Sequence, residues 1–221
     1  MKKRFLVIGL GRFGLNVVKT LVKLKADVLA VDINEERVKI ATQYTNQCLV
    51  CDPTKKSVLQ EIGIKNIDHA IVGIGNNLQG TILATMNLKD LGVKRITVRI
   101  DDNEYENVIE RLGATKVIIP EEASAIQLAN EVVSDSIIDY HEVKNNYAMV
   151  KMIVNDGYIQ KPLKELNARN KFKINIVGII RNDEFILPMA DDVIMSNDII
   201  ILVGKNKDVT KFEHFIFLVE K

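Results

Sequence analysis

The sequence predicts an α/β fold, in which a Rossmann-type, doubly wound parallel sheet over residues 1–134 is followed by a small α+β lobe over residues 135–221. Three observations support this prediction. The first apolar run opens directly into a glycine-rich turn, Gly9 to Gly14. Apolar runs of strand length then alternate with amphipathic helical segments, a pattern that builds a parallel sheet with helices on both faces. Beyond residue 135, strands separated by turn residues replace this alternation.

The glycine-rich turn follows the apolar stretch Phe5 to Ile8 and precedes a helix. Gly9 permits a sharp turn, Gly11 lets a pyrophosphate approach the backbone, and Gly14 lets the helix pack close to the strand. The free N–H groups and the positive dipole end at the start of that helix favour an anion. The spacing therefore predicts a phosphate-binding turn.

The remaining elements of the first lobe follow in strict alternation. Asn34 is expected to cap a helix, and the acidic residues behind it suit a first helical turn. Strands are expected at residues 28–31, 48–50, 70–73, 96–99 and 116–119. Helices are expected from Arg12, at 34–41, before Gly63, at 79–91, at 104–112, and from Pro120 as the crossover helix that ends the lobe.

Sheets of this kind bind ligands beyond the carboxyl ends of their strands, near the point where the strand order reverses. Residues that directly follow the expected strands are therefore candidate contacts. Those in the glycine turn are Gly9, Gly11, Arg12, Phe13 and Gly14. Those at the later strand ends are Asp32, Asp52, Gly73, Ile74, Gly75, Asn76, Asn77 and Arg99. We predict that they bind a nucleotide, with the two aspartates able to contact a sugar or a base edge.

Arg12 and Arg99 indicate which nucleotide this is. Two guanidinium groups neutralise more negative charge than a diphosphate linkage carries, which favours a terminal triphosphate or a phosphorylated ribose. Asp32 argues against a ribose phosphate because the two anions would repel each other. Arg99 has an alternative interpretation as an ion-pair partner of Asp101. Glu121 is either an ordinary partner of the helix dipole or a carboxylate for a hard cation.

The composition excludes several classes of protein. The formal net charge of +1 does not indicate a nucleic-acid-binding lobe. The basic start of the chain precedes only a short apolar run, and no apolar stretch approaches the length that spans a bilayer. We therefore expect a cytoplasmic protein that reaches a membrane only through a partner. Cys48 and Cys51 have C-x-x-C spacing without further metal ligands nearby, so we interpret them as small core residues.

The second lobe has a less regular pattern. Strands are expected at residues 147–154, 173–180, 185–187 and 198–203, with a hairpin turn at 181–184, a short helix at 161–166 and a last helix at 210–217. The lobe contains no nucleophile elbow, no recognisable acid/base pair of carboxylates and no histidine cluster. We therefore do not expect an enzyme.

Several segments together resemble one family closely. They are K-R-F-L-V-I-G-L-G-R-F-G, V-L-A-V-D-I-N-E-E-R-V, I-V-G-I-G-N-N-L-Q-G-T, L-G-A-T-K-V-I-I-P-E-E, L-N-A-R-N-K-F-K-I-N-I-V-G and D-I-I-I-L-V-G. The combination resembles the cytosolic gating subunits of bacterial Ktr potassium-uptake systems, in the regulator-of-potassium-conductance (RCK) family. The resemblance implies homodimers that assemble into an octameric ring beneath a membrane potassium-channel subunit. It also implies that ATP and ADP compete, with ATP favouring the active ring.

The resemblance also implies roles for single residues. Arg12 looks like the arginine that reaches the terminal phosphate, and Asp32 resembles the ribose-binding acid. Glu121 resembles a carboxylate that helps to bind a divalent cation, Mg²⁺ or Ca²⁺, whereas Arg99 stands where the family commonly has a lysine. An inactivating cyclic di-AMP site between two second lobes is implied around Arg169, Ile174, Asn175, Ile176 and Pro188. The two isoleucines have an alternative interpretation as plain core or interface residues.

Two other classes of function remain open. The glycine turn and Asp32 also allow an NAD(H)-dependent oxidoreductase or an NADH-responsive redox sensor. The second lobe offers the first class no convincing proton donor, and we find no basic DNA-reading helix for the second. The sequence therefore favours a regulatory subunit that binds ATP or ADP, with NAD(H) as the alternative ligand.

Overall fold

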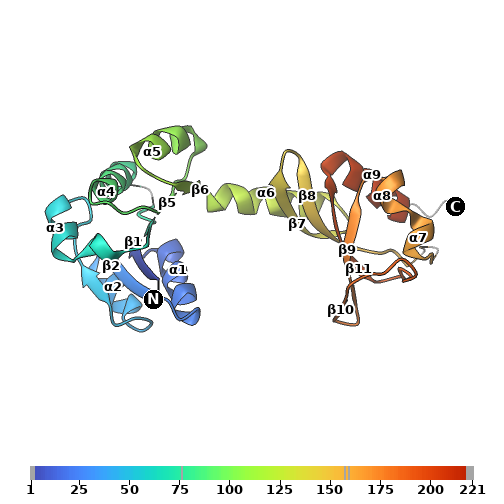
Figure 1. The fold of residues 1–221 in the computed structure, drawn as a ribbon, viewed down its shortest axis with the longest axis horizontal. Helices are drawn as coiled ribbons and strands as arrows, with labels where there is room; N and C mark the ends of the chain where they lie inside the picture. The colour runs from blue at the N-terminus through green and yellow to red at the C-terminus, as the bar shows by residue number, and fades with distance from the viewer. Residues whose placement is uncertain (1–2, 76, 157, 159, 218–221) are drawn as a thin grey trace. The chain divides into compact units, whose positions relative to one another are not determined.

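The computed structural model describes residues 3–75, 77–156, 158 and 160–217. The chain divides into two compact units, Met1–Glu121 and Glu122–Lys221, each with its own sheet (Figure 1). The division between the units lies after Glu121, near the start of helix α6 (Pro120–Val133). The lobe boundary predicted from the sequence, after Ser134, lies just beyond the end of that helix. Assignment of α6 to the first lobe stays a prediction.

The first unit holds a parallel sheet with the strand order β3-β2-β1-β4-β5-β6. Its strands are β1 (Arg4–Ile8), β2 (Asp27–Asp32), β3 (Cys48–Val50), β4 (His69–Val72), β5 (Ile96–Arg99) and β6 (Lys116–Ile118). Its helices are α1 (Arg12–Lys23), α2 (Glu35–Ala41), α3 (Lys56–Glu61), η1 (Ile64–Asn66), α4 (Leu78–Asp90), η2 (Asn103–Tyr105) and α5 (Glu106–Leu112). The chain crosses back over the sheet between β3 and β4, so the strand order reverses between β1 and β4. The predicted doubly wound fold is confirmed.

Alternating side chains of β1 show why helices cover both faces of this sheet. Leu6 and Ile8 point to one face, where they belong to a core with residues of α3, α4 and α5. Val7 points to the other face and packs in a core with residues of α1 and α2. Cys51 packs against the first core and Cys48 against the second, and both are free thiols.

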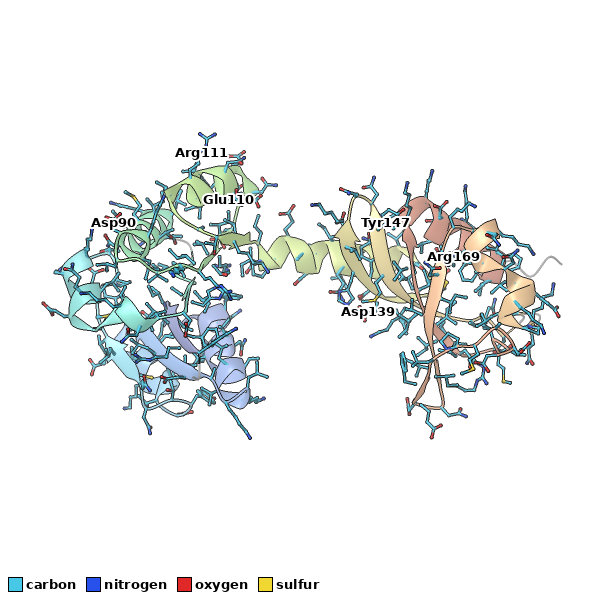
Figure 2. All side chains as sticks on the ribbon, viewed as in Figure 1. Asp90, Glu110, Arg111, Asp139, Tyr147 and Arg169 are labelled. Atoms are coloured by element: carbon cyan, nitrogen blue, oxygen red, sulfur yellow. The ribbon has the colours of Figure 1, made fainter. Side chains whose placement is uncertain are left out.

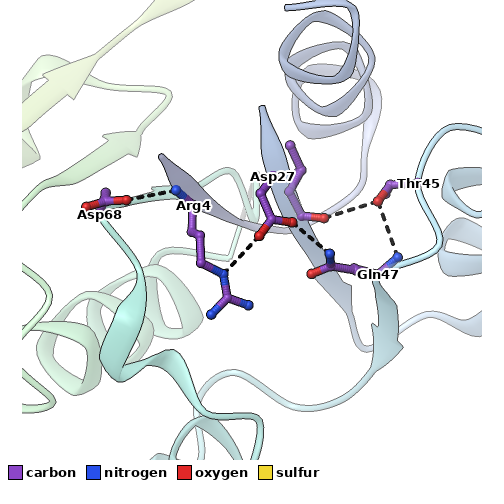
Figure 3. Close-up of polar contacts among 6 residues, drawn as sticks. Arg4, Asp27, Thr45, Gln47 and Asp68 are labelled. Atoms are coloured by element: carbon purple, nitrogen blue, oxygen red, sulfur yellow. Dashed lines mark hydrogen bonds and ion pairs between the residues drawn. The ribbon is translucent and has the colours of Figure 1, made fainter. Parts of the chain in front are cut away.

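A cluster of hydrogen-bonded polar residues connects neighbouring segments at the amino end of the parallel sheet (Figure 3). Arg4 Nε donates to Asp27 Oδ2 at 3.0 Å, and the Arg4 N–H donates to Asp68 Oδ2 at 2.8 Å. Gln47 Nε2 donates to Asp27 Oδ1 at 2.7 Å, and Thr45 Oγ1 donates to the Val28 carbonyl at 3.1 Å. These contacts join β1 and β2 to the segments that lead into β3 and β4. They therefore help to fix the strand register, which also positions the residues at the carboxyl ends of the strands.

The second unit contains an antiparallel sheet with the strand order β10-β9-β11-β8-β7. Its strands are β7 (Ile137–Lys144), β8 (Tyr147–Ile153), β9 (Asn175–Arg181), β10 (Glu184–Ile186) and β11 (Ile199–Lys205). Besides most of α6, its helices are α7 (Leu163–Leu166), α8 (Ala168–Lys171) and α9 (Asn206–Phe217). Phe212 of α9 is fully buried among residues of the sheet. Asp139 of β7 binds Lys151 of β8 with an oxygen-to-nitrogen distance of 2.7 Å (Figure 2).

Three details of this unit differ from the sequence prediction, and one of them is helix α8, which was not predicted. Residues 137–144 form strand β7, which the sequence analysis did not identify. The two-residue loop Asn145-Asn146 has φ angles of 55° and 63°, as expected for the tight turn of a two-residue hairpin. Helix α9 begins at Asn206, four residues before its predicted start at Thr210. In the described part of the chain, none of the helices combines the length and apolarity needed to cross a bilayer.

Candidate functional site

A cavity of about 250 Å³ lies at the carboxyl edge of the parallel sheet. It is lined by Gly9, Asp32, Ile33, Arg37, Asp52, Pro53, Thr54, Ile74, Asn77 and Gly80. Five of these lining residues, Gly9, Asp32, Asp52, Ile74 and Asn77, were predicted from the sequence. Asp32 ends β2, and the others follow β1, β3 and β4, so the cavity lies beside the reversal of strand order, where such sheets bind ligands.

The three glycines of the first turn differ in how closely they are packed. Gly9 has a φ of +86°, and a Cβ there would lie 2.6 Å from the Gly73 carbonyl oxygen. A Cβ on Gly14 would lie 1.8 Å from the Gly9 carbonyl oxygen, so helix α1 packs directly against the turn. Around Gly11, no described heavy atom lies within 4 Å of where a Cβ would be. Gly9 and Gly14 are therefore required by packing, whereas Gly11 leaves open space at the amino end of α1.

The Asp32 carboxylate clamps two turns together. Its side chain is only 4% exposed. Oδ2 accepts the Leu10 N–H at 2.6 Å, and Oδ1 accepts the Asn34 N–H at 2.8 Å. Arg37 Nη1 lies 3.6 Å from Oδ2. Asp32 thus fixes the glycine turn against the start of α2, in addition to any contact with a ligand.

Asp52 is held by a turn of its own. Its Oδ1 accepts hydrogen bonds from the Thr54 hydroxyl at 2.6 Å and from the Thr54 N–H at 3.0 Å. The hydroxyl hydrogen bond is the main cause that lowers the pKa of Asp52. Lys55 Nζ lies 4.0 Å from Oδ2. The carboxylate is therefore an ionised acceptor at the wall of the cavity.

The loop after β4 completes the turn region. A Cβ on Gly73 would lie 3.1 Å from Phe13 Cδ1, and Phe13 packs against the α1 side of the core. Gly75 has a φ of +78°, and a Cβ there would lie 3.6 Å from Arg99 Nη1. Asn76, a predicted contact, lies outside the described residues. Asn77 caps α4, with its Oδ1 accepting the Gly80 N–H at 2.8 Å.

Arg99 is engaged by two carboxylates. Its Nη2 lies 2.6 Å from Asp101 Oδ1 and 2.6 Å from Glu121 Oε1, and its side chain is 12% exposed. The hydrogen bond from Arg99 is the main cause that lowers the pKa of Glu121. The described residues contain no group of three His, Cys, Asp or Glu side chains that could hold a metal ion. The described part of the chain therefore does not complete a cation site around Glu121.

Arg12 contrasts with Arg99. It is the first residue of α1 and is exposed, and it forms no ion pair within the described part of the chain. Its guanidinium is thus the unpaired cation beside the free N–H groups of the α1 amino end.

Five of the ten lining residues were not predicted from the sequence, namely Ile33, Arg37, Pro53, Thr54 and Gly80. Arg37 stands in the first turn of the helix that follows Asp32, and Gly80 stands in the first turn of α4. Helix-start signals would have pointed to both positions, because the start of each such helix lies at the ligand edge of the sheet. Thr54 gives no comparable signal.

A second cavity, of about 240 Å³, lies in the second unit. It is lined by Leu163, Lys164, Asn167, Ala168, Arg169, Ile174, Asn175 and Ile176. It brings together four of the five residues implied for cyclic di-AMP, with Arg169 provided by α8 (Figure 2), whereas Pro188 is not part of its lining. Ile174 is 1% exposed and belongs to the core, as its alternative interpretation expected.

Comparison with known proteins gives the class of the chain. Residues 5–120 match the TrkA-N domain, and residues 147–216 match the TrkA-C domain. Ktr system potassium uptake protein C of Bacillus subtilis (strain 168) is 39% identical over 214 residues, covering 96% of this chain and 97% of that protein. Ktr system potassium uptake protein A of the same organism is 32% identical over 213 residues, covering 96% of each chain.

Solved structures agree on the fold. The crystal structure of the GsuK RCK domain has a TM-score of 0.68 at 13% identity, covering 98% of this chain and 48% of that chain. The GsuK channel bound to NAD has the same TM-score and identity, covering 98% of this chain and 40% of that chain. Fold and site thus define a Rossmann-type module followed by a small α+β lobe. The chain belongs to the TrkA-N/TrkA-C family of Ktr system potassium uptake proteins.

The two glycines of the turn make a matched pair of variants. Gly14→Ala should lower the free energy of unfolding by about 3 kcal/mol or more, because its Cβ would overlap the Gly9 carbonyl oxygen. Gly11→Ala should change that free energy by about 1 kcal/mol or less, yet, if a nucleotide such as ATP binds with its phosphates at this turn, weaken that binding about tenfold or more by filling the open space. Urea unfolding and calorimetric titration measure the two effects. Unchanged ATP affinity in Gly11→Ala would contradict a phosphate at this turn.

Proposed function

We propose that this chain is the cytoplasmic regulatory subunit of a bacterial potassium-uptake system, and that it senses ATP and ADP rather than catalysing a reaction. The observation that carries the proposal is the order of chemical groups along the carboxyl edge of the parallel sheet, which is called the ligand edge below. The free helix start follows β1, Asp32 ends β2, and Asp52 follows β3, and these strands are neighbours in the sheet. This order matches the phosphate, ribose and base of one nucleotide. The family membership of the chain gives that nucleotide a role in potassium uptake.

The other half of the edge favours a triphosphate over a dinucleotide. Arg99 and Asp101 follow or end β5, and Glu121 follows β6. Arg99 is a cation that can pair with a phosphate, and the two carboxylates can hold a divalent cation beside it, whereas none of the three suits a second, uncharged ring system. Arg12, with its unpaired guanidinium, is the group that distinguishes the terminal phosphate of ATP from the shorter chain of ADP. NAD(H) is the alternative ligand, and calorimetric titration distinguishes it from ATP and ADP.

A divalent cation completes the charge balance in this proposal. One guanidinium, Arg99, faces two carboxylates, Asp101 and Glu121, which leaves one net negative charge there. A terminal phosphate placed beside them requires additional positive charge. Glu121 supplies one oxygen to Mg²⁺ or Ca²⁺, and the phosphates supply others.

Regulation then follows from differential binding. A ligand shifts a two-state equilibrium only when it binds the two states with different affinity. In the assembly we propose, homodimers form an octameric ring on a membrane potassium-channel subunit, which is the only attachment to the membrane. ATP with its cation favours the active ring, and ADP does not. No nucleic-acid polymer takes part.

The cavity in the second unit is the proposed site of an inactivating second ligand, cyclic di-AMP. Its support is the grouping of a guanidinium, an amide and apolar side chains, from Arg169, Asn175 and Ile176, around one hollow. A guanidinium and an amide suit a phosphodiester, and apolar side chains suit a flat base. Pro188 would join this site only through another copy of the lobe.

The first test uses Arg12→Ala. The variant should lose about tenfold or more in ATP affinity while ADP affinity stays near that of the unchanged chain, because the lost charged hydrogen bond reaches only the terminal phosphate. Lys23→Ala is the matched control, since it removes a positive charge from the last turn of the same helix. Calorimetric titration gives the ATP and ADP affinities of the unchanged chain and of both variants. Equal loss for ATP and ADP would remove Arg12 from the discrimination, and tighter binding of NAD or NADH than of either would overturn the choice of ligand.

The second test concerns the cation. Glu121→Gln should abolish the rise in melting temperature that Mg²⁺ or Ca²⁺ adds to the ATP-bound protein, because the amide loses the negative charge that holds the ion. Glu122→Gln removes the adjacent carboxylate and should keep that rise. A cation effect that persists in Glu121→Gln would show that the ion binds elsewhere.

The third test addresses the partner. The chain should co-purify with the membrane subunit of a Ktr-type potassium system, and vesicles that hold both should take up potassium faster with ATP than with ADP. An unrelated membrane channel with the same affinity tag serves as the control. Failure to co-purify with either nucleotide would contradict the proposed role.

A further inference from the structure

The amino edge of the parallel sheet, opposite the ligand edge, carries cations that the nucleotide site does not use. They stand where four of the strands begin, with Lys3 before β1, Lys25 before β2, Arg95 before β5 and Lys116 as the first residue of β6. All four are exposed, and among the residues that the structure describes none of them forms an ion pair. These four residues are called the basic row below.

The strand order places the basic row along one line. The strands concerned are neighbours in the order β2-β1-β4-β5-β6, and parallel strands all begin at the same edge. Neighbouring strands are about 4.8 Å apart, so the row extends over about 19 Å. An extended polypeptide rises about 3.4 Å per residue, so a segment of about six residues spans the row.

Strand β4, in the middle of the row, experiences this positive charge. It begins at His69, whose Nε2 lies 2.8 Å from Thr97 Oγ1. Burial is the main cause that lowers the pKa of His69, and the charges of Arg95 and Lys116 lower it further. The middle of the amino edge therefore disfavours another cation and favours an anion.

The carboxylates of this edge are directed at Arg4 and not at the basic row. Asp27 Oδ2 lies 3.0 Å from Arg4 Nε, and Asp68 Oδ2 accepts the Arg4 N–H at 2.8 Å (Figure 3). Within the described part of the chain, the basic row therefore keeps its charge available for a partner from outside the chain.

We propose that the amino edge binds an extended acidic segment of another protein, whose carboxylates pair with the basic row. This inference rests on the proposed function, under which the segment belongs to the membrane potassium-channel subunit. A linear polyanion matches a line of cations, whereas a bilayer presents its phosphates over a plane and would also meet Asp27 and Asp68. Because the cavity lies at the opposite edge, the segment and the nucleotide can be bound at the same time.

The first measurement tests the surface with a labelled peptide of alternating glutamate and serine, and a glutamine–serine peptide of the same length is the uncharged control. The unchanged chain should bind the acidic peptide and not the uncharged one. The double variant Arg95→Glu, Lys116→Glu should bind the acidic peptide about tenfold more weakly or worse, because two attractions become repulsions. Its melting temperature should stay near that of the unchanged chain, since both side chains are exposed and unpaired in the described structure.

The matched control is the double variant Lys161→Glu, Lys207→Glu. It makes the same change in net charge at two exposed lysines of the second unit, and it should keep the affinity for the acidic peptide. Equal peptide affinities in the two double variants would overturn the inference, because the binding would then depend on net charge and not on the basic row.

The second measurement identifies the partner. The unchanged chain and the control variant should co-purify with the membrane subunit of a Ktr-type potassium system, and the Arg95→Glu, Lys116→Glu variant should not. Co-purification of that variant overturns the inference while leaving the proposed function intact. Failure of the unchanged chain to co-purify overturns the proposed function, and the assigned partner with it.

Two other occupants are distinguished with the same variants. Binding of phosphatidylglycerol vesicles, lost in Arg95→Glu, Lys116→Glu and without binding of the acidic peptide, would assign the edge to a bilayer and overturn the inference. A smaller oligomer by light scattering in that variant alone would assign the edge to another copy of this chain, which also overturns it.

Discussion

The Asp32 carboxylate is the contact on which the first unit depends. It is buried, and its two oxygens accept backbone N–H groups from two different turns, at Leu10 and Asn34. Burial of a charge is costly unless it is hydrogen-bonded, so these bonds have to persist. They hold the glycine turn against the start of α2 and thereby fix the amino end of α1 beside the cavity. In the function we propose, the phosphate position is therefore set before any ligand arrives, which reduces the free-energy cost of binding.

The two halves of the ligand edge are prepared in different ways. Near β2 and β3, hydrogen bonds to backbone and to Thr54 hold the aspartates in place. Near β5 and β6, Arg99 is held by carboxylates that a phosphate would have to displace or share with a cation. In the function we propose, the first half provides affinity that ATP and ADP have in common. The second half, together with Arg12, responds to the terminal phosphate.

Much of this could be predicted from residue patterns, and the exceptions have physical reasons. The parallel sheet, its strand ends and the glycine turn follow from local periodicity and spacing. Strand β7 was missed because its polar residues hide the alternation, and its turn, Asn145-Asn146, lacks a glycine. Phe13 as a nucleotide contact stays a prediction, and its packing beside Gly73 could not be predicted, because only the β1–β4 pairing brings the two residues close. Pro188 lies apart from the lining of the second cavity for a similar reason, since its loop position depends on the β9–β10 hairpin.

The sequence by itself determined the family and the fold class, because glycine spacing, strand periodicity and helix caps are local properties of the chain. It also determined which residues stand at the ligand edge, since every parallel strand ends there. Only the tertiary structure decided how those residues are used. Arg99 could equally have faced a ligand or an acid, and the register of β5 and β6 puts it against Glu121. Asp32 was expected as a sugar ligand, and the pairing of β1 with β2 makes it a clamp as well. Such partners are decided by distances of a few ångströms between segments far apart in the chain, which no local pattern specifies.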